Sequence, residues 1–129
     1  MSTPENRYFA ITRSGALHKA AGLNDAFLFA GDEGYIWLDY IDPSPESLAE
    51  LGTSLGIHPL SIEDCLNGDQ LPKLDLFPTY SFMTFSIFEP TSDGFQAHEL
   101  DLFISKRFLI TVSRREVNGT SVLSSMEAS

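Results

Sequence analysis

The sequence predicts a single domain of the α/β or mixed α+β kind, a mixed β-sheet with helices inserted between its strands and flanking them. The length of 129 residues suits one hydrophobic core. Short runs of apolar, β-branched and aromatic residues recur between glycines and prolines, as expected for strands. Between these runs, leucines recur at helical spacing, which indicates an amphipathic helix packed on the sheet.

The first elements predicted are a β-hairpin and a short helix. Residues 7–12 are rich in aromatic and β-branched side chains, and Ser14-Gly15 turns the chain into a second short strand at 16–19. Asn24 is a suitable N-cap for a helix through residues 26–30, which Gly31 would close.

A buried strand and an amphipathic helix follow. Tyr35–Ile41 is apolar on both alternating faces, which predicts a strand in the interior of the sheet. Ser44-Pro45 then begins a helix by the rule of a cap followed by proline, and Gly56 ends it. The stripe that this helix would bury consists of Leu48, Leu51 and Leu55.

The next predicted helix, at 59–66, carries the residues of greatest functional interest. His58 can stand at the cap position. Pro59 suits the first helical position, because its missing N–H would have no partner there and its φ is already helical. At about 100° per residue, Ile62, Cys65 and Leu66 share the inward face. The opposite side carries Leu60, Glu63 and Asp64, so two acids flank an exposed leucine. Such a surface suits a protein contact or an ion site shared between subunits.

The last part of the sheet is predicted from three strands. Residues 80–88 are apolar on both faces and are bounded by Pro78 and Pro90. After a loop at Gly94, residues 99–104 alternate so that Leu100, Leu102 and Ile104 would form the buried face. A tight reversal at 106–107 leads into the strand 108–112, which would pair antiparallel in the same sheet.

Composition argues against several classes of binding partner and against a location within the membrane or outside the cell. Eighteen acidic against eight basic residues give a net charge of −10, which disfavours nucleic acids and anionic lipids and favours cations. No apolar run approaches the roughly 20 residues needed to cross a bilayer. A polar N-terminus without a signal sequence, and a single cysteine, predict a cytosolic chain.

Other residues with potential chemistry have simpler explanations. His18, His58, His98 and Cys65 do not match any recognised zinc spacing. Asp39 and Asp42 could act as a general acid and base, but Asp42-Pro43 is better explained as the turn before the next helix. We therefore expect no catalytic residues.

Several motifs, taken in order, resemble a known family. They are the segments 37–43, 56–60 with Glu63-Asp64, Pro72-Lys73, 99–104 and 108–112. Together they are similar to the amino-terminal cytoplasmic domain of CorA-type divalent cation transporters, over roughly residues 36–113. One departure is Leu71, where that family usually has a basic residue.

The resemblance implies a regulatory role and not an enzyme. Residues 1–115 would form the cytoplasmic domain and 116–129 a tail or the truncated start of the next helix, with the transmembrane region absent from this chain. In a pentamer at the cytoplasmic side of the membrane, Glu63 and Asp64 would bind regulatory Mg²⁺ between subunits, with Co²⁺, Ni²⁺ or Zn²⁺ as alternatives, and Leu60 would lie in the interface. Bound ions would relieve carboxylate repulsion and close the pore.

Two alternatives remain at this stage. One is the cytosolic domain of a related zinc transporter, which shares the same amino-terminal architecture. The other is a free-standing hydrolase domain with a carboxylate-bound metal, which would need a third or fourth ligand converging on the same cleft.

Overall fold

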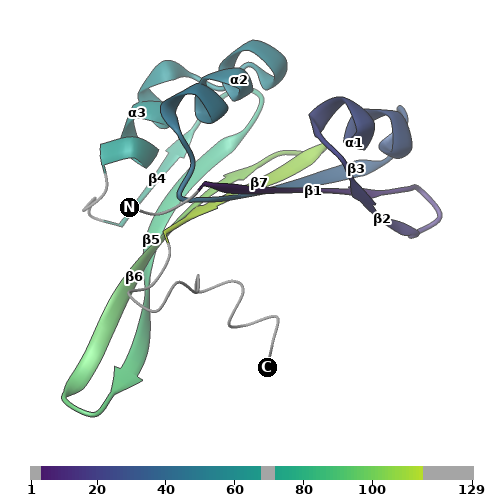
Figure 1. Cartoon of the computed structure of the whole chain (residues 1–129). Helices are drawn as coiled ribbons and strands as arrows, with labels where there is room; N and C mark the ends of the chain where they lie inside the picture. The colour runs from purple at the N-terminus through teal and green to yellow at the C-terminus, as the bar shows by residue number, and fades with distance from the viewer. Residues whose placement is uncertain (1–3, 68–71, 115–129) are drawn as a thin grey trace.

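A single mixed sheet with three helices on one of its faces forms the fold (Figure 1). The computed structural model describes residues 4–67 and 72–114. In chain order the elements are β1 (Glu5–Ile11), β2 (Leu17–Ala20), α1 (Leu23–Ala30), β3 (Tyr35–Ile41), α2 (Pro45–Leu55), α3 (Pro59–Asn67), β4 (Lys73–Leu76), β5 (Ser81–Thr91), β6 (Gly94–Ile104) and β7 (Phe108–Ser113). The predicted fold class is therefore confirmed.

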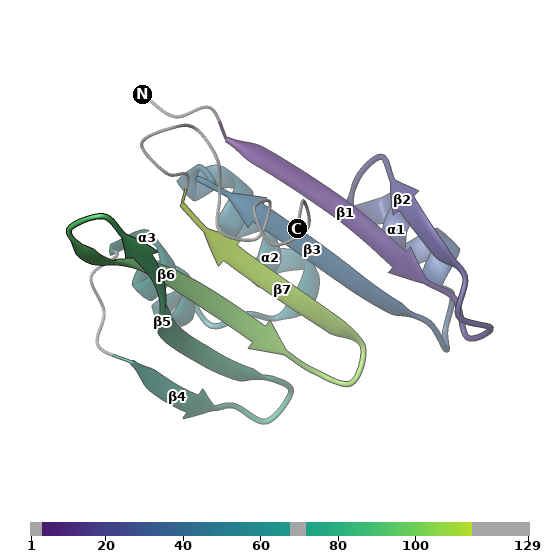
Figure 2. The same cartoon turned by 90° about the horizontal axis from the view of Figure 1, so that it is seen from below.

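The strand order is β2-β1-β3-β7-β6-β5-β4, which Figure 2 shows from the side opposite to the helices. Among the described strands, β3 and β7 run parallel and the other neighbouring pairs are antiparallel. The predicted hairpins β1–β2 and β6–β7 are both present. Strand β3 lies between β1 and β7, so the interior position predicted from its two apolar faces is correct.

Helix α2 begins and ends as its sequence predicts. The Ser44 hydroxyl accepts a hydrogen bond from Ser47 N at 3.2 Å, and Pro45 occupies the first turn. Gly56 follows with φ of 71°, a left-handed conformation that glycine adopts without steric cost. Leu48 and Leu51 are fully buried in the core between α2 and the sheet.

Helix α1 begins one residue before the expected cap. Asn24 lies inside the helix, and Gly22 takes the N-cap position without any side-chain hydrogen bond. The acidic side chain of Asp25 instead accepts a hydrogen bond from Ala21 N at 2.8 Å and ties the preceding chain to the first turn. The Asn24 prediction was wrong, because the helix begins after Gly22 and the side-chain bond at its start comes from Asp25 within the first turn.

The hairpin of β5 and β6 is longer than predicted and extends beyond the helical layer (Figure 1). Pro90 does not end β5, since the strand continues to Thr91, which pairs with Gly94. Strand β4 pairs with β5 as far as Thr84, so within the described residues no strand pairs with the other side of β5 near Pro90. A proline without an N–H is tolerated on such an unpaired side. Strand β4 itself was not predicted.

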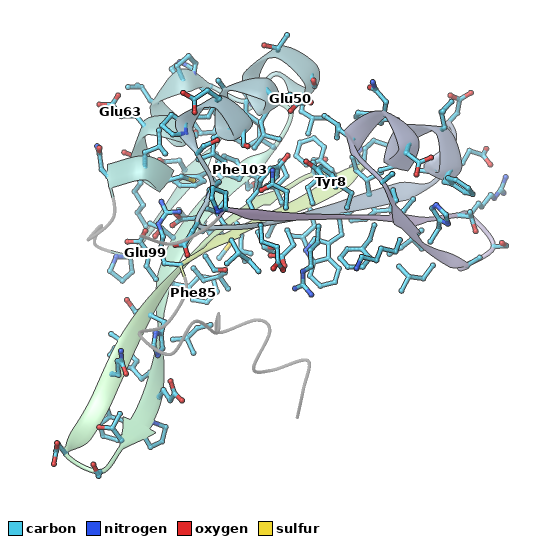
Figure 3. The ribbon with its side chains drawn as sticks, in the orientation of Figure 1. Tyr8, Glu50, Glu63, Phe85, Glu99 and Phe103 are labelled. Carbon is cyan, nitrogen blue, oxygen red and sulfur yellow. The ribbon has the colours of Figure 1, made fainter. Side chains whose placement is uncertain are left out.

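The core face of β6 also differs from the prediction. Phe103 is fully buried in the core and Asp101 is 3% exposed, whereas Ile104 is 38% exposed. Phe103 packs on Phe82 with ring centroids 4.7 Å apart, and it lies between the sheet and the helices in Figure 3. Leu100, Leu102 and Ile104 lie on the opposite face, where Leu100 is buried at 5% exposure as predicted but Leu102 is only half-buried, so the pattern did not identify the face that enters the core.

Candidate metal site on helix α3

The start of α3 is held by the residue that the sequence predicts as its cap. His58 Nδ1 accepts a hydrogen bond from Leu60 N at 3.0 Å. The backbone N–H of His58 in turn donates to the Tyr80 hydroxyl at 2.9 Å. These two bonds fix the first turn of α3 to the end of the loop that precedes β5.

The inner face of α3 is formed by two small residues. Ser61 and Cys65 are buried, and Ser61 Oγ lies 3.1 Å from the Tyr80 hydroxyl. Cys65 confirms the inward face predicted for it, and Ile62 packs against the core while partly buried. Leu66 does not follow the prediction, since it is 37% exposed. Ser61 and Cys65 are one turn apart, and this spacing turns Leu66 away from the sheet.

The outer side of α3 presents the leucine and the two acids singled out in the sequence. Leu60 is 62% exposed. Glu63 is exposed and points away from the sheet in Figure 3. Asp64 differs, since its side chain is only 24% exposed and lies toward β4. The two neighbouring carboxylates therefore meet different surroundings.

Asp64 is paired with a lysine. Its Oδ2 contacts Lys73 Nζ, and the same ammonium lies 3.2 Å from Asp75 Oδ2. The hydrogen bond to Asp64 is the main cause that raises the pKa of Lys73, with a smaller contribution from Asp75, while burial opposes it. Lys73 therefore stays charged at neutral pH. Sequence analysis found Pro72-Lys73 as a motif but gave this lysine no role.

The described residues of α3 could supply part of a site for a hard divalent cation. Carboxylate oxygens suit Mg²⁺, which usually keeps several waters and takes only one or two carboxylates from the protein. Within residues 4–67 and 72–114, no three histidine, cysteine, aspartate or glutamate side chains converge on one point. Glu63 and Asp64 could each offer one carboxylate to an open site that waters or groups from elsewhere would complete, and they do not form a closed cage.

A second acid, which sequence reasoning missed, lies beneath the helix. Asp101 is buried on β6, and burial is the main cause that raises its pKa to about 7. Glu99 adds to the increase, whereas Thr84 and Cys65 oppose it. Thr84 stands directly across on β5, yet neither its Oγ1 nor Asp101 Oδ1 has a well-formed hydrogen bond within the part of the chain described. The sequence did not indicate this burial, because Asp101 alternates with leucines and lies on the less hydrophobic face of β6.

Cys65 completes this buried cluster from the helix side. Burial, followed by the charge of Asp101, raises the pKa of its thiol far above the ordinary value. A thiol in this state is a poor nucleophile. Arg114 lies at the edge of the cluster, where its guanidinium donates to the backbone oxygen of Cys65.

The remaining candidate residues are dispersed. Asp39 is fully buried on the face away from the helices, where Arg7 Nε donates to it at 2.9 Å and Thr111 Oγ1 at 2.7 Å. Asp42 takes φ of 48° in the turn after β3. His18 lies beside α1. In the long hairpin of β5 and β6, His98 Nε2 lies 2.9 Å from Glu89 Oε2. Leu71 and residues 116–129 fall outside the described residues.

A comparison with known families identifies the family to which the chain belongs. The profile of a family described as "CorA-like Mg2+ transporter protein" matches residues 32–127, which include all of α3 and the strands around it. The chain belongs to the CorA-like family.

Several relatives of this family show similarity to part of the chain. YfjQ of Bacillus subtilis, whose name marks it as a candidate metal ion transporter, is 32% identical over 88 residues, 68% of this chain and 27% of the relative. The magnesium transporter ALR1 of Saccharomyces cerevisiae is 37% identical over 62 residues, 48% of this chain and 7% of the relative. The chain therefore spans about a quarter or less of these two CorA-like relatives.

Solved structures show the same fold. The full-length CmaX protein superposes with a TM-score of 0.67 at 19% identity, covering 85% of this chain and 35% of that one. The soluble domain of CorA from Methanocaldococcus jannaschii superposes with a TM-score of 0.62 at 15% identity, covering 94% of this chain and 43% of that one. Among the described residues, no helix has the length and apolar character needed to cross a membrane.

Proposed function

We propose that this chain is the ion-sensing domain of a CorA-like divalent cation transporter. In this proposal the domain lies on the cytoplasmic side of the membrane within a ring of five copies. Mg²⁺ bound between neighbouring copies through Glu63 and Asp64 holds the ring in its closed state. Co²⁺, Ni²⁺ and Zn²⁺ are alternative ions for the same carboxylates.

One observation carries the proposal. Helix α3 presents Glu63 and the 62% exposed Leu60 on its outward side, and Asp64 already holds a cationic partner. An interface between copies on this side of α3 would bury Leu60 and would let acids of two copies share an ion. The net charge of −10 means that copies repel one another unless cations intervene.

Loss of the ion explains opening in the same terms. Carboxylates about 4 Å apart repel by about 1 kcal/mol per pair in water, and more where water is partly excluded. Without an ion, this repulsion separates neighbouring copies, and ion binding reverses the change. Ion binding and pore opening are then coupled equilibria. Ion binding shifts the opening equilibrium by the same factor by which opening lowers the affinity of the site for the ion.

The proposal is tested in the transporter that contains this domain, by measuring the Mg²⁺ concentration that protects it from proteolysis. Glu63→Ala combined with Asp64→Ala should remove the protection. The matched control is Glu46→Ala with Glu50→Ala, which removes two exposed acids from α2 and should leave protection unchanged. Equal protection of the parent protein and the Glu63/Asp64 variant would overturn the proposal.

A further inference from the structure

The ammonium of Lys73 occupies a defined position between two acids. Its Nζ contacts Asp64 Oδ2 on α3 and lies 3.2 Å from Asp75 Oδ2, two residues along β4. The side chain is 33% exposed, so water reaches this site only in part. Lys73 therefore neutralises the acid that was predicted to bind an ion.

The sheet fixes this position. The backbone of Lys73 is paired with Thr84 in the antiparallel ladder between β4 and β5. Its ammonium lies 5.7 Å from the centre of the ring of Phe82, which is fully buried in the core. A lysine attached to a paired strand and lying over a fixed ring loses less freedom on forming its ion pair than one on an open loop.

This position conflicts with a metal ion at the same oxygen. A divalent cation must come within about 2 to 2.6 Å of a carboxylate oxygen to coordinate it. An ammonium in hydrogen-bond contact with that oxygen would then stand beside the ion with the same sign of charge, and the two would repel strongly. Asp64 Oδ2 therefore cannot coordinate an ion while it is bonded to Lys73, and an ion at the other carboxylate oxygen would still be repelled by the nearby ammonium.

We propose that Lys73 is a built-in competitor for divalent cations at Asp64, which it occupies when the ion is absent and leaves for Asp75 when the ion binds. This inference rests on the proposed function and deepens it. The long flexible stem of lysine allows the ammonium to move while it keeps one of its two carboxylate partners. The competitor raises the ion concentration at which the site fills and thus sets the threshold of the sensor.

The experiment measures the midpoint Mg²⁺ concentration for protease protection of the transporter that contains this domain. Lys73→Gln should lower the midpoint about fivefold or more, because a competing charge worth about 1 kcal/mol or more in water is removed. Lys106→Gln is the charge-matched control, since Lys106 is exposed in the turn between β6 and β7, and its midpoint should stay within about twofold of the parent protein. Lys73→Met keeps the stem over Phe82 and should match Lys73→Gln, which separates charge from folding.

A second measurement uses this chain and no protease. In the ion-free protein, the ion pair of Lys73 should slow the exchange of its ammonium protons with water, which is measured at the ¹⁵N ammonium resonance. Asp64→Asn should remove this protection. The inference is overturned if the midpoints of Lys73→Gln and Lys73→Met equal that of the parent protein, or if Lys106→Gln lowers its midpoint equally. Either result leaves the proposed function standing, provided that Glu63→Ala with Asp64→Ala still abolishes protection. If that double variant is protected like the parent protein, the proposed function fails as well.

Discussion

At the scale of single residues, Leu60 is the exposed apolar side chain that lies beside the proposed ion ligands on α3. Leu60 is 62% exposed although it lies in a helix that buries Ser61 and Cys65. Exposed leucines occur singly on many proteins, but this one stands beside Glu63 and one residue after the proline that begins the helix. The role of Leu60 is therefore best tested by measuring association between copies and not by measuring the free energy of unfolding.

Leu60→Ser should weaken association between copies of the transporter while changing the free energy of unfolding of this chain by less than about 0.5 kcal/mol. Loss of an apolar contact in an interface has the first effect, and the exposure of Leu60 explains the second. Sedimentation gives the assembly state, and urea unfolding gives the stability. Leu28→Ser is the control, because Leu28 on α1 is 81% exposed and lies far from α3 (Figure 1). Equal assembly of the Leu60→Ser and Leu28→Ser variants would contradict the interface role.

Sequence reasoning placed Leu60 and Glu63 on the exposed side of α3 correctly, whereas Asp64 is only 24% exposed and lies toward a partner that the sequence did not reveal. Helical periodicity alone predicts that Leu60, Glu63 and Asp64 point away from the sheet. The ion pair of Asp64 with Lys73 depends on where β4 pairs with β5, which no local pattern in the sequence determines. Asp101 was missed for a related reason, since the face that β6 buries depends on its register with β5.

At the scale of elements, helix α3 rests on a buried acid, and this contact makes stability depend on pH. The pKa of Asp101 is raised to about 7 in the folded chain, above its ordinary value near 3.8. The folded state therefore retains a proton that the unfolded chain has already lost between these two values. The contribution of Asp101 to the free energy of unfolding therefore falls as pH rises from about 4 to about 7. Above pH 7 the whole contribution is lost.

Asp101→Asn should remove this dependence. Between pH 5 and pH 8, the free energy of unfolding of the parent protein should fall by about 2 to 3 kcal/mol relative to that of the variant. Urea unfolding at a series of pH values measures the difference. Asp93→Asn replaces an exposed acid in the turn of the β5–β6 hairpin, and its difference from the parent protein should be flat over the same range. A flat difference for Asp101→Asn would show that Asp101 is ionised in the folded state over the whole range.

The elements that were predicted well are those with strong local signals. Helix α2 has its cap, its proline and its closing glycine within one segment, so its bounds followed from sequence alone. Strand β4 is only four residues long and alternates half-buried with exposed positions, which leaves little periodic signal. Its existence depends on β5, a partner later in the chain.

At the scale of the whole molecule, α3 lies on the same face of the sheet as the other helices, and polar side chains join strands on the opposite face (Figure 1). Asp39 joins three adjacent strands, because it bonds Arg7 on β1 and Thr111 on β7 from its own position on β3. Trp37 Nε1 donates to the same Thr111 hydroxyl at 3.1 Å. These hydrogen bonds link β1, β3 and β7 through side chains, in addition to the backbone pairing of the three strands.

The central claim is that the two carboxylates of α3 bind a divalent ion between copies, and crystallography with Mn²⁺ tests it most directly. Mn²⁺ can replace Mg²⁺ and is located by its anomalous scattering. In crystals of the transporter that contains this domain, we predict an anomalous peak within about 2.5 Å of a Glu63 or Asp64 oxygen and at the boundary with a neighbouring copy, with Lys73 Nζ moved away from Asp64. Peaks confined to other places, with Asp64 still paired to Lys73, would contradict the account.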